Sequence, residues 1–577
     1  MSLLLKTAIR LHGRRASLRL ERATFAPRAA QHEFLLRTLR RNAATVFGRL
    51  HNFDRIKSAE DYRRSVPVRD YEGFRPFVKR IMEGERALLT KEQPVLLTMT
   101  SGTTGEQKFI PVTPQSARME ARSMRQWLYR ALLAHPSYMD GQSVAIISRA
   151  VEGHTPSGLA YGSASGLTYR NVPRLIRRAQ AIPYAVAEIA DYDRRYFLIA
   201  RFALAARVSF IITPNPSTLL RLAQVMSQCV EDLLRAIHDG ALGIAATSQP
   251  SVCVQLSKTL RPDPARARLL ARVVAATGSL RPADCWPDLK LIACWVGGSV
   301  GTQARKLADA YGPLPLRDLG YIASEGRFTV PTEDDTPSGI LALGSNYYEF
   351  IPEGEAANAQ PTVLSSHELE ANKRYSVLLT TAGGLYRYRI QDIVEVTGFH
   401  HRAPLVAFVR KEGEMTNITG EKLHVNHFIL ALDETRRRAR LDLEQFRAVP
   451  DYAANRYDIH LELRSQVSHA RLQREALPLI DEALASVNVE YAQKRASGRL
   501  RAPRLRLMRA GWANQISRQQ IDASKRDTQY KWPLLCQQAC PEDASFIIST
   551  IEMDESRAAE RRAVETRAPA ANFPAAA

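Results

Sequence analysis

Residues 94–108, PVLLTMTSGTTGEQK, contain the most informative local pattern in the sequence. The apolar first half of this stretch is of strand type, its second half is a loop of Gly, Thr and Ser, and a helix is expected from about Gln115 to Leu133. Gly102 and Gly105 allow the loop to turn with converging N–H groups, and Lys108 adds a cation. Strand, small-residue loop and helix in this order are typical of a phosphate-binding turn, although the spacing is not that of a P-loop. The alternative is an ordinary loop rich in hydroxyl groups.

From this segment to about Ser338, apolar runs of strand type alternate with helical patterns. The strand-type runs include Ser143–Ala150, Val208–Ser217 and Leu289–Gly298. Such alternation predicts a mostly parallel α/β sheet system. Strand patterns dominate after Ser338, and a smaller α+β pattern follows Arg410. We therefore expect an α/β protein whose large N-terminal domain has parallel or mixed sheets flanked by helices and a β-barrel-like part.

The net charge is distributed unevenly. The 577 residues include 80 basic and 59 acidic side chains, which gives a formal charge of +21. Residues 1–41 hold +8 of it and residues 491–531 hold +9, so the rest of the chain is nearly neutral. This distribution excludes a uniformly basic coat and leaves two local basic surfaces. A nucleic-acid-binding protein is one alternative, although the sequence has no helix-turn-helix, zinc finger or aromatic platform for single strands.

Six cysteines without a CxxC pair indicate free thiols in a reducing compartment, and hence a cytoplasmic protein. Two of them, in CQQAC (Cys536–Cys540), are interpreted as packing residues one helical turn apart. His400 and His401 are adjacent, so we expect their rings to point apart and not to share a metal ion. The most apolar run, Tyr196–Ile212, contains two arginines and is interpreted as a core helix followed by a strand, not as a membrane span. The Arg-rich N-terminus leaves a transit peptide open.

Further motifs follow the loop in a fixed order. WVGGS (Trp295–Ser299) ends one apolar strand, YIASEG (Tyr321–Gly326) ends the next, and YRYRIQD (Tyr386–Asp392) stands 18 residues before Arg410. NAATVFGRLHNFDRI, SVPVRDYEGFRPFVKRIMEGE, YYEFIP, FVRKEGEMTNITGEKL and QYKWPLL extend the pattern over nearly the whole chain. With these motifs the chain resembles the Gretchen Hagen family of auxin-responsive acyl-acid amido synthetases. That family is a branch of the adenylate-forming superfamily, which includes firefly luciferase and acyl-CoA ligases.

The resemblance implies a domain plan. It places a large ATP- and acyl-binding domain at residues 31–400, a hinge at 401–411 and a small mobile α+β domain at 412–552. A basic arm, residues 1–30, precedes these domains. An Ala/Pro-rich tail, residues 553–577, follows them and is expected to be disordered.

The resemblance also implies a site for ATP and Mg²⁺, in which cations offset the repulsion between a carboxylate and a phosphate. The phosphates would be held by Thr100, Ser101, Gly102, Thr103, Thr104 and Lys108. Adenine and ribose would contact Gly297, Gly298, Tyr321 and Asp392. The catalytic residues would be Glu325, which helps to place Mg²⁺, Arg410 at the hinge, and Lys531, which bridges the substrate carboxylate and the α-phosphate. Arg122 and the segment Glu152–Gly166 are expected in the acyl pocket.

Two positions depart from the family pattern. Gln391 replaces the Gly of a YRxGD turn, which would tighten or shift the ribose contact, and Leu534 replaces the Arg of QYKxPR. The leading hypothesis is adenylation of a carboxylic acid, followed by transfer of the acyl group to an amine, with an amino acid as the expected acceptor. Transfer to a thiol such as CoA is the alternative. We expect a monomer that has no membrane span and binds no specific nucleic acid.

Overall fold

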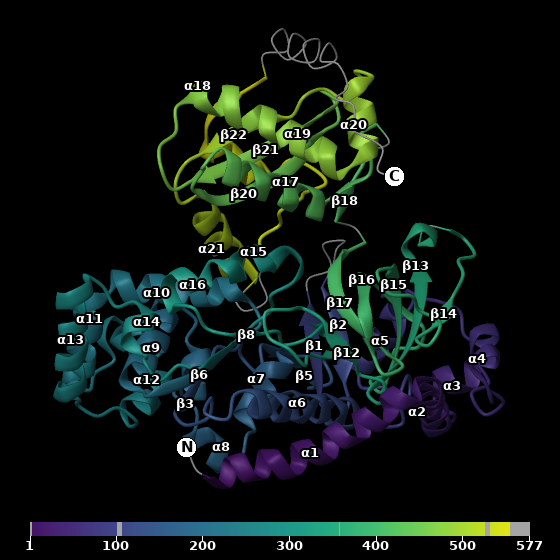
Figure 1. Cartoon of the computed structure of the whole chain (residues 1–577). Coiled ribbons are helices and arrows are strands. Elements are labelled where there is room, and N and C mark those ends of the chain that lie inside the picture. Colours follow the sequence, from purple (N-terminus) through teal and green to yellow (C-terminus); the bar gives the residue numbers. More distant parts are fainter. Residues whose placement is uncertain are drawn as a thin grey trace, which may run out of the picture. The chain divides into compact units, whose positions relative to one another are not determined.

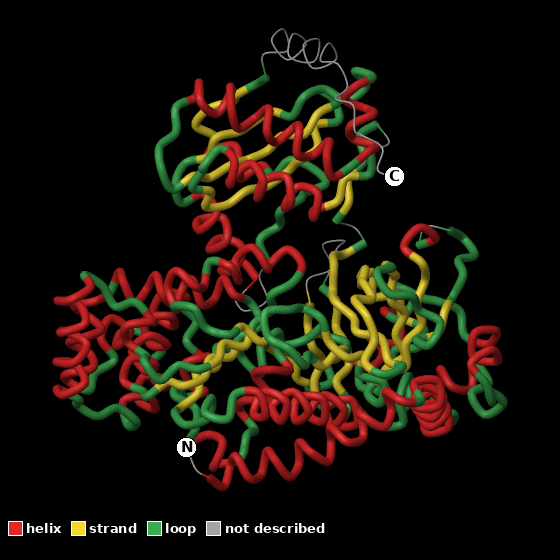
Figure 2. Tube along the Cα trace, viewed as in Figure 1, coloured by secondary structure: helices red, strands yellow, loops and turns green. Residues whose placement is uncertain are grey.

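The computed structural model describes residues 3–100, 107–356, 358–412, 414–419, 421–524 and 531–553. The chain folds into two compact units (Figure 1), one running up to Glu412 and the other formed by residues 413–524 and 531–553. Both units combine helices and strands (Figure 2), so the predicted α/β class is confirmed. Nearly all of the predicted tail, residues 554–577, lies outside the described residues.

The first unit contains the predicted parallel sheet. Its strands stand in the order β3, β6, β7, β8, and each neighbouring pair is parallel. The two central strands, β6 and β7, are largely apolar and buried, as is usual for a sheet covered by helices on both faces. Their bounds are Gln142–Ala145 for β3, Val208–Ile212 for β6, Leu291–Ala293 for β7 and Leu316–Arg317 for β8.

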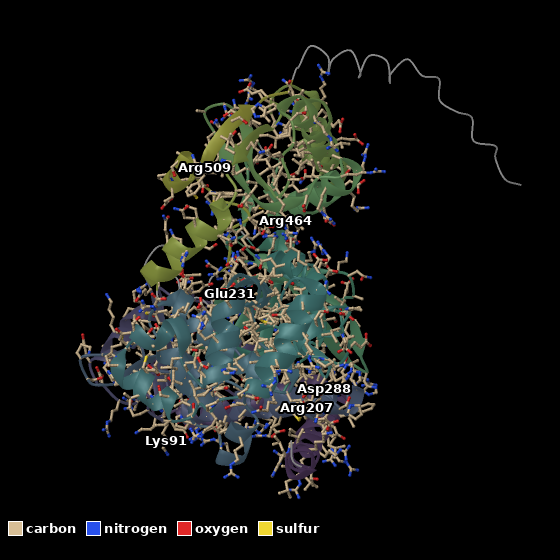
Figure 3. The ribbon with its side chains drawn as sticks, turned by 90° about the vertical axis from the view of Figure 1, so that its left-hand side faces the viewer. Lys91, Arg207, Glu231, Asp288, Arg464 and Arg509 are labelled. Atoms are coloured by element: carbon tan, nitrogen blue, oxygen red, sulfur yellow. The ribbon has the colours of Figure 1, made fainter. Side chains whose placement is uncertain are left out.

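Helix α9 (Tyr192–Ala205) is the apolar run that the sequence assigned to the core. It includes Arg201, which is buried, and the Arg201 guanidinium donates hydrogen bonds of 3.2 Å to the carbonyl groups of Ala236 and Ala241. These bonds explain how a charged group is tolerated inside the core. Between α9 and β6, Arg207 forms an ion pair of 2.6 Å with Asp288 at the surface (Figure 3). The predicted helix followed by a strand is confirmed.

A second sheet of the first unit has seven strands, and all its pairs are antiparallel. Their order is β11 (Thr329–Val330), β12 (Gly339–Leu341), β17 (Ala403–Lys411), β16 (Tyr388–His400), β15 (Arg374–Thr381), β13 (Asn346–Pro352) and β14 (Leu364–Ser365). Strand β17 occupies most of the segment predicted to be a hinge. Its apolar residues pair with β12 on one side and β16 on the other, so residues 403–411 belong to the sheet, and the first unit ends only at Glu412.

The N-terminal residues form a helix and not a separate arm. Helix α1 (Leu3–Phe25) runs along α6 (Pro114–Ala134), the helix predicted from about Gln115 to Leu133 (Figure 1). The two backbones approach closely at Gly13, where an added Cβ would lie 2.4 Å from Cβ of Tyr129. Gln126 of α6 also donates a hydrogen bond of 3.0 Å to the carbonyl of Ala16. None of the described helices is long and apolar enough to cross a bilayer.

The second unit is built on a four-stranded mixed sheet. Its order is β20 (Leu443–Asp451), β21 (Arg456–Leu463), β22 (Arg504–Met508) and β23 (Ile547–Ile551), and only the middle pair is parallel. Helices α17 (Val425–Arg438) and α19 (Leu477–Val487) share the apolar core of this sheet. In the same core the Arg447 guanidinium binds Asp543 at 2.7 Å and stacks over Trp532 at 4.2 Å.

Candidate functional site

The Gly/Thr/Ser loop connects two strands and does not lead directly into a helix. Strands β1 (Leu96–Thr100) and β2 (Lys108–Val112) pair antiparallel, with Thr100 opposite Lys108. The prediction of a loop that opens a helix is therefore wrong, because the apolar residues after Lys108 pair with β1 before α6 begins. Of the predicted phosphate ligands, Ser101, Gly102, Thr103 and Thr104 lie outside the described residues. The two ends of the loop, Thr100 and Lys108, thus stand opposite each other in one hairpin.

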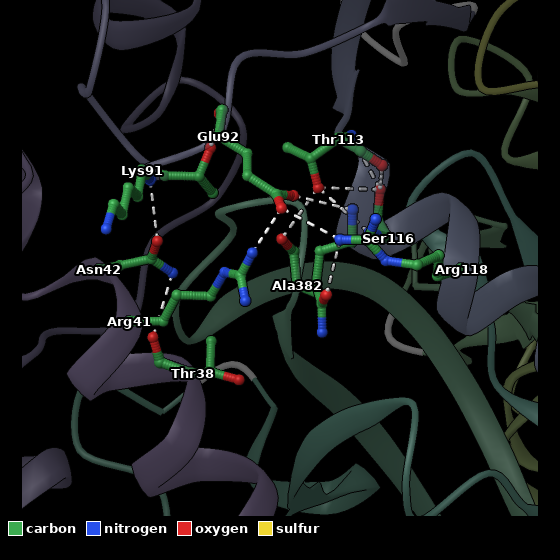
Figure 4. A network of polar contacts seen from close by, with 11 residues as sticks. Thr38, Arg41, Asn42, Lys91, Glu92, Thr113, Ser116, Arg118 and Ala382 are labelled. Atoms are coloured by element: carbon green, nitrogen blue, oxygen red, sulfur yellow. Dashed lines mark hydrogen bonds and ion pairs between the residues drawn. The ribbon is translucent and has the colours of Figure 1, made fainter.

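A polar network joins the segments on either side of this hairpin (Figure 4). The carboxylate of Glu92 accepts hydrogen bonds from Arg41, from Arg118 at 3.0 Å and from the backbone N–H of Gln115 at 3.0 Å. Thr113 caps α6 by accepting from the N–H of Ser116 at 3.1 Å. The network therefore joins helix α2 (Pro27–Asn42), the segment before β1 and the start of α6.

Lys108 lies against Tyr71. Its ammonium is 5.7 Å from the ring centroid, and the guanidinium of Arg75 is 4.9 Å from the same centroid. The Tyr71 hydroxyl accepts a hydrogen bond of 2.7 Å from the N–H of Phe109. The Arg75 guanidinium is also bound by the carboxylate of Glu72 at 2.6 Å, so the positive charge beside the loop comes chiefly from Lys108, which suits an anionic ligand.

Asp392 is the centre of the predicted nucleotide site. Asp392 is 2% exposed, and its Oδ2 accepts a hydrogen bond of 2.5 Å from the Tyr321 hydroxyl. Oδ1 forms an ion pair with the ammonium of Lys411, which stands opposite Asp392 in the register of β16 and β17. The structure thus brings the predicted residues Tyr321 and Asp392 together, and adds Lys411, which was not among the predicted site residues.

The backbone is irregular just before Asp392. Gln391 has a φ of 61°, in the left-handed region that favours glycine. The pairing of β15 with β16 jumps between Ser376, opposite Ile393, and Leu378, opposite Arg389. Such bulges commonly lie beside active sites, where they re-aim a side chain. The bulge explains why a glycine suits this position and how the carboxylate of Asp392 leaves the regular strand direction.

Glu325 lies in the turn between β9 (Ile322–Ala323) and β10 (Gly326–Arg327). Burial raises the pKa of the Glu325 carboxyl, the ammonium of Lys411 opposes this rise, and Asp392 adds to it. Glu325 also shares a hydrogen bond with the hydroxyl of Tyr388. The two carboxylates thus lie around a single ammonium, an arrangement that favours a further cation.

The two glycines predicted to line the adenine site are required by the protein's own packing. An added Cβ on Gly297 would lie 2.4 Å from Cβ of Pro337, and one on Gly298 would lie 3.2 Å from the ring of Phe408. The Phe408 ring centroid is 5.6 Å from that of Tyr321. Both glycines therefore belong to the same assembly as Tyr321, while their contact with adenine stays a prediction.

Asp318 is a further residue of this assembly, and it lies outside the sequence motifs. Its carboxylate accepts hydrogen bonds from the N–H of Val296 at 2.7 Å and from the N–H of Gly320 at 2.6 Å. Burial raises the pKa of Asp318 to about 6, although these backbone hydrogen bonds oppose the rise. Asp318 thereby ties the end of β7, which leads to Gly297, to the end of β8, which leads to Tyr321. The sequence signal for such a tie is an acid that directly follows a short strand, Leu316–Arg317, and stands two residues before Gly320.

Arg410 is buried and already paired. Its guanidinium binds Glu353 at 2.6 Å and donates to the carbonyl of Lys411 at 3.0 Å. In the strand register Arg410 stands opposite Ile393, next to Asp392. Its position is thus adjacent to the site, and its contact with a ribose or phosphate stays a prediction.

Arg122 lies apart from these residues. It is half-buried on α6, where burial and the neighbouring guanidiniums of Arg19, Arg37 and Arg125 lower its pKa. Its role in an acyl pocket stays a prediction. A small apolar pocket lies beyond the end of β3, and none of its lining residues belongs to the predicted segment Glu152–Gly166. It is lined by Ala145, Ile146, Ile147, Tyr169, Ile182, Pro183, Tyr184, Val186, Ala187, Arg195 and Ile199.

The adjacent histidines do not point apart. His400 and His401 both approach Oε1 of Glu21, at 2.9 and 2.8 Å. His401 has a φ of 53° in the turn between β16 and β17, which rotates its side chain to the same side as that of His400. The other oxygen of Glu21 accepts from Arg130 at 3.0 Å. This cluster brings together three groups that could hold a metal ion, and it fastens α1 to the hairpin.

Lys531 belongs to the second unit. The next residue, Trp532, is buried and donates a hydrogen bond of 2.8 Å to the carbonyl of Phe446, which fixes the backbone beside Lys531. Leu534, at the position of the family's arginine, is 5% exposed and belongs to the apolar core. The carbonyl of Leu534 also accepts from the N–H of Ala448 at 2.8 Å. Leu534, which replaces the arginine of the family pattern, is thus a core residue of this unit.

Comparison with known proteins gives a consistent result. Models of the N-terminal, central and C-terminal domains of the GH3 family match residues 16–316, 339–411 and 426–539. Indole-3-acetic acid-amido synthetase GH3.8 of Oryza sativa subsp. indica is 27% identical, over 88% of this chain and 87% of its own length. Jasmonoyl–L-amino acid synthetase JAR6 of Nicotiana attenuata is 24% identical, over 87% of this chain and 90% of its own length. A structure of GH3.15 acyl acid amido synthetase has a TM-score of 0.82 at 22% identity, and the match covers 93% of this chain and 96% of that one.

Proposed function

This chain belongs to the GH3 family, and on that premise we propose that it is an ATP-dependent acyl-acid amido synthetase. In the first step a carboxylate oxygen attacks the α-phosphorus of ATP, pyrophosphate leaves, and an acyl-adenylate forms. In the second step an amine attacks the acyl carbon, AMP leaves, and an amide forms as the amine loses a proton. Relatives that carry the names of jasmonoyl- and indole-3-acetic acid-amido synthetases support an amino acid as the acceptor.

The observation that carries the proposal is the assembly around Asp392. A ribose offers two adjacent hydroxyl groups, and a carboxylate held by a tyrosine and a lysine is preorganised to accept hydrogen bonds from them. Lys108, beside the loop, would supply positive charge for the phosphates, while the nearby Arg75 is paired with Glu72. Pyrophosphate is a good leaving group only when its charge is offset, so this cation would act where charge develops.

Mg²⁺ fits the residues beside this assembly. Glu325 offers a carboxylate whose pKa is raised by burial and by the nearby Asp392, so a divalent cation would stabilise its ionised form. When bound, the ion would neutralise phosphate charge during the adenylation step. Glu325 would hold the Mg²⁺ ion. Lys411 is paired with the carboxylate of Asp392, so Asp392 would not bind the ion.

Lys531 is proposed to act in the first step only. A lysine ammonium can bridge the attacking carboxylate and the α-phosphate, which lowers the repulsion between the two anions. The buried Trp532 beside it holds the backbone in place. Transfer to the amine needs no such bridge, because the acyl-adenylate has already lost the carboxylate charge.

The test separates the two steps. Hydroxylamine traps acyl-adenylates as hydroxamates, so a panel of aryl, indole and fatty acids identifies the acid, and an amino-acid panel with the best acid identifies the acceptor. Lys531→Ala should lose pyrophosphate release and retain amide formation from pre-formed acyl-adenylate. CoA in place of the amino acid tests transfer to a thiol. The mechanism is wrong if Lys531→Ala adenylates the acid at the unchanged rate, or if no acid gives ATP-dependent pyrophosphate release.

A further inference from the structure

Helix α1 has a buried face and an exposed apolar stripe. Leu5, Ala16 and Leu20 are buried on the inner face. On the outer face the exposed fractions are 69% for Leu4, 60% for Leu11, 47% for Leu18 and 55% for Phe25. These four residues are spaced by seven, which is close to two helical turns, so they form one line along the helix. Isolated exposed leucines are ordinary, whereas a continuous line of them marks an interaction surface.

Arginines lie on both sides of this stripe. Arg10 and Arg14 lie on one side of it, Arg15 and Arg19 on the other, and all four are exposed. Exposed Arg22 adds a fifth charge, and no ion pair within the described part of the chain involves any of the five. The one acidic residue of α1, Glu21, is occupied by Arg130 and the two histidines. The outer face of α1 therefore combines apolar side chains with uncompensated positive charge.

The positive charge continues onto the neighbouring helices. Burial and the guanidiniums of Arg19, Arg37 and Arg125 lower the pKa of Arg122, so each of these three side chains lies near Arg122. Arg37 is also paired with Glu33 at 2.8 Å. The four arginines come from α1, α2 and α6, so the surface extends sideways from the stripe. Like charges so placed are stabilised by an anionic partner.

We propose that the outer face of α1 binds the surface of an anionic lipid bilayer, independently of the proposed catalytic function. Leu4, Leu11 and Leu18 would enter the boundary between headgroups and acyl chains, and the flanking arginines would contact lipid phosphates. A second copy of the chain fits less well, because two such faces repel each other. The positions that would complete a coiled-coil seam are Thr7, Arg14 and Glu21 in one register and Ala8, Arg15 and Arg22 in the other, so both seams contain charged residues. A nucleic acid would use the arginines but would leave the leucines in water.

The experiment is co-sedimentation of the full chain with vesicles, using phosphatidylcholine alone or mixed with phosphatidylglycerol. One variant carries Leu4→Gln, Leu11→Gln and Leu18→Gln, and another carries Arg10→Gln, Arg14→Gln and Arg15→Gln. The control for the leucine variant changes three exposed leucines elsewhere, Leu50, Leu269 and Leu430, to Gln. The control for the arginine variant changes three exposed arginines elsewhere, Arg235, Arg268 and Arg272, to Gln. All these side chains are exposed, so the variants should keep the fold, which circular dichroism checks.

We expect binding to the anionic vesicles only, and a loss of affinity of roughly tenfold or more in both α1 variants but in neither control. Added salt should weaken binding of the wild type. The proposal is overturned if the wild type does not bind anionic vesicles, or if the α1 leucine variant binds as well as its control. It is also overturned if the α1 variants still bind anionic vesicles and instead lose binding to RNA, or lose self-association measured by light scattering.

Discussion

The hydroxyl of Tyr321 donates a hydrogen bond to Oδ2 of Asp392, and the two oxygens are 2.5 Å apart. The two residues are 71 positions apart in the sequence and belong to two separate motifs, Tyr321–Gly326 and Tyr386–Asp392. The Tyr321 ring packs against Phe328 at 4.6 Å and Phe408 at 5.6 Å. Tyr321 therefore orients the carboxylate of Asp392 from a fixed position, and its hydroxyl can be removed without changing its packing.

We expect Tyr321→Phe to lower kcat/KM for ATP by about tenfold or more, because a hydrogen bond to a charged group contributes about 1.5–3 kcal/mol. Pyrophosphate release at varied ATP concentration measures the effect. Tyr347→Phe is the matched control, since the buried Tyr347 hydroxyl has no hydrogen-bond partner among the described residues. Equal ATP kinetics in the two variants would show that Tyr321 does not orient Asp392.

Replacing Gln391 by glycine should stabilise the first unit by about 1 kcal/mol, because a non-glycine residue in the left-handed region costs about 1–2 kcal/mol. The midpoint of urea unfolding measures the change. Gln224→Gly is the control, since Gln224 is inside helix α10 (Pro216–Gln228) and glycine there should destabilise the protein. A loss of stability in Gln391→Gly would mean that the glutamine side chain contributes more than its backbone costs.

The acid side of the pH–rate profile should report Glu325. Its pKa is raised above the ordinary 4.5 by burial, and the carboxylate must be ionised to hold Mg²⁺, so activity should fall as the pH drops through this raised value. Lys411→Met removes the cation that opposes the rise, so the acid limb should move to a higher pH. Lys258→Met changes an exposed lysine elsewhere and serves as the control. An acid limb at the same pH in wild type and Lys411→Met would contradict the assignment.

Local patterns predicted the elements well, and long-range contacts account for what they missed. Helix α6 and strand β6 follow from periodicity and composition, which the chain carries locally. The pairing of Lys411 with Asp392 depends on the register of β16 and β17, and that register includes bulges which no short motif encodes. The hairpin after Thr100 was missed because five residues, KFIPV, suffice for an edge strand and resemble a loop. His400 and His401 converge only because of a turn conformation with positive φ.

Leu534→Arg, which restores the family residue, should destabilise the second unit by roughly 3 kcal/mol or more, because it places an unpaired charge in an apolar core. Thermal unfolding measures the loss. Leu430→Arg is the control, since Leu430 is 56% exposed on α17 and should tolerate the charge. Equal stability of the two variants would show that the side chain at position 534 can reach solvent.

The two thiols of CQQAC lie side by side, and we expect Cys540 to be unusually reactive. Residues 536–540 are not helical, contrary to the sequence-based interpretation, and the sulfur atoms of Cys536 and Cys540 are 3.5 Å apart. A hydrogen bond from Cys536 and the cation of Arg447 lower the pKa of Cys540 to about 7, although burial opposes the shift. Because the thiolate is the reactive form, iodoacetamide should alkylate Cys540 with an inflection near this pH, well below that of an ordinary thiol.

Cys536→Ala removes the donor and should shift the inflection of Cys540 to a higher pH. Cys229 is the internal control, since burial raises the pKa of its thiol and its alkylation should require a more alkaline pH. Peptide mapping by mass spectrometry after timed alkylation follows both cysteines in one sample. If Cys540 and Cys229 react with the same pH dependence, or if Cys536→Ala leaves Cys540 unchanged, the thiol pair does not stabilise a thiolate.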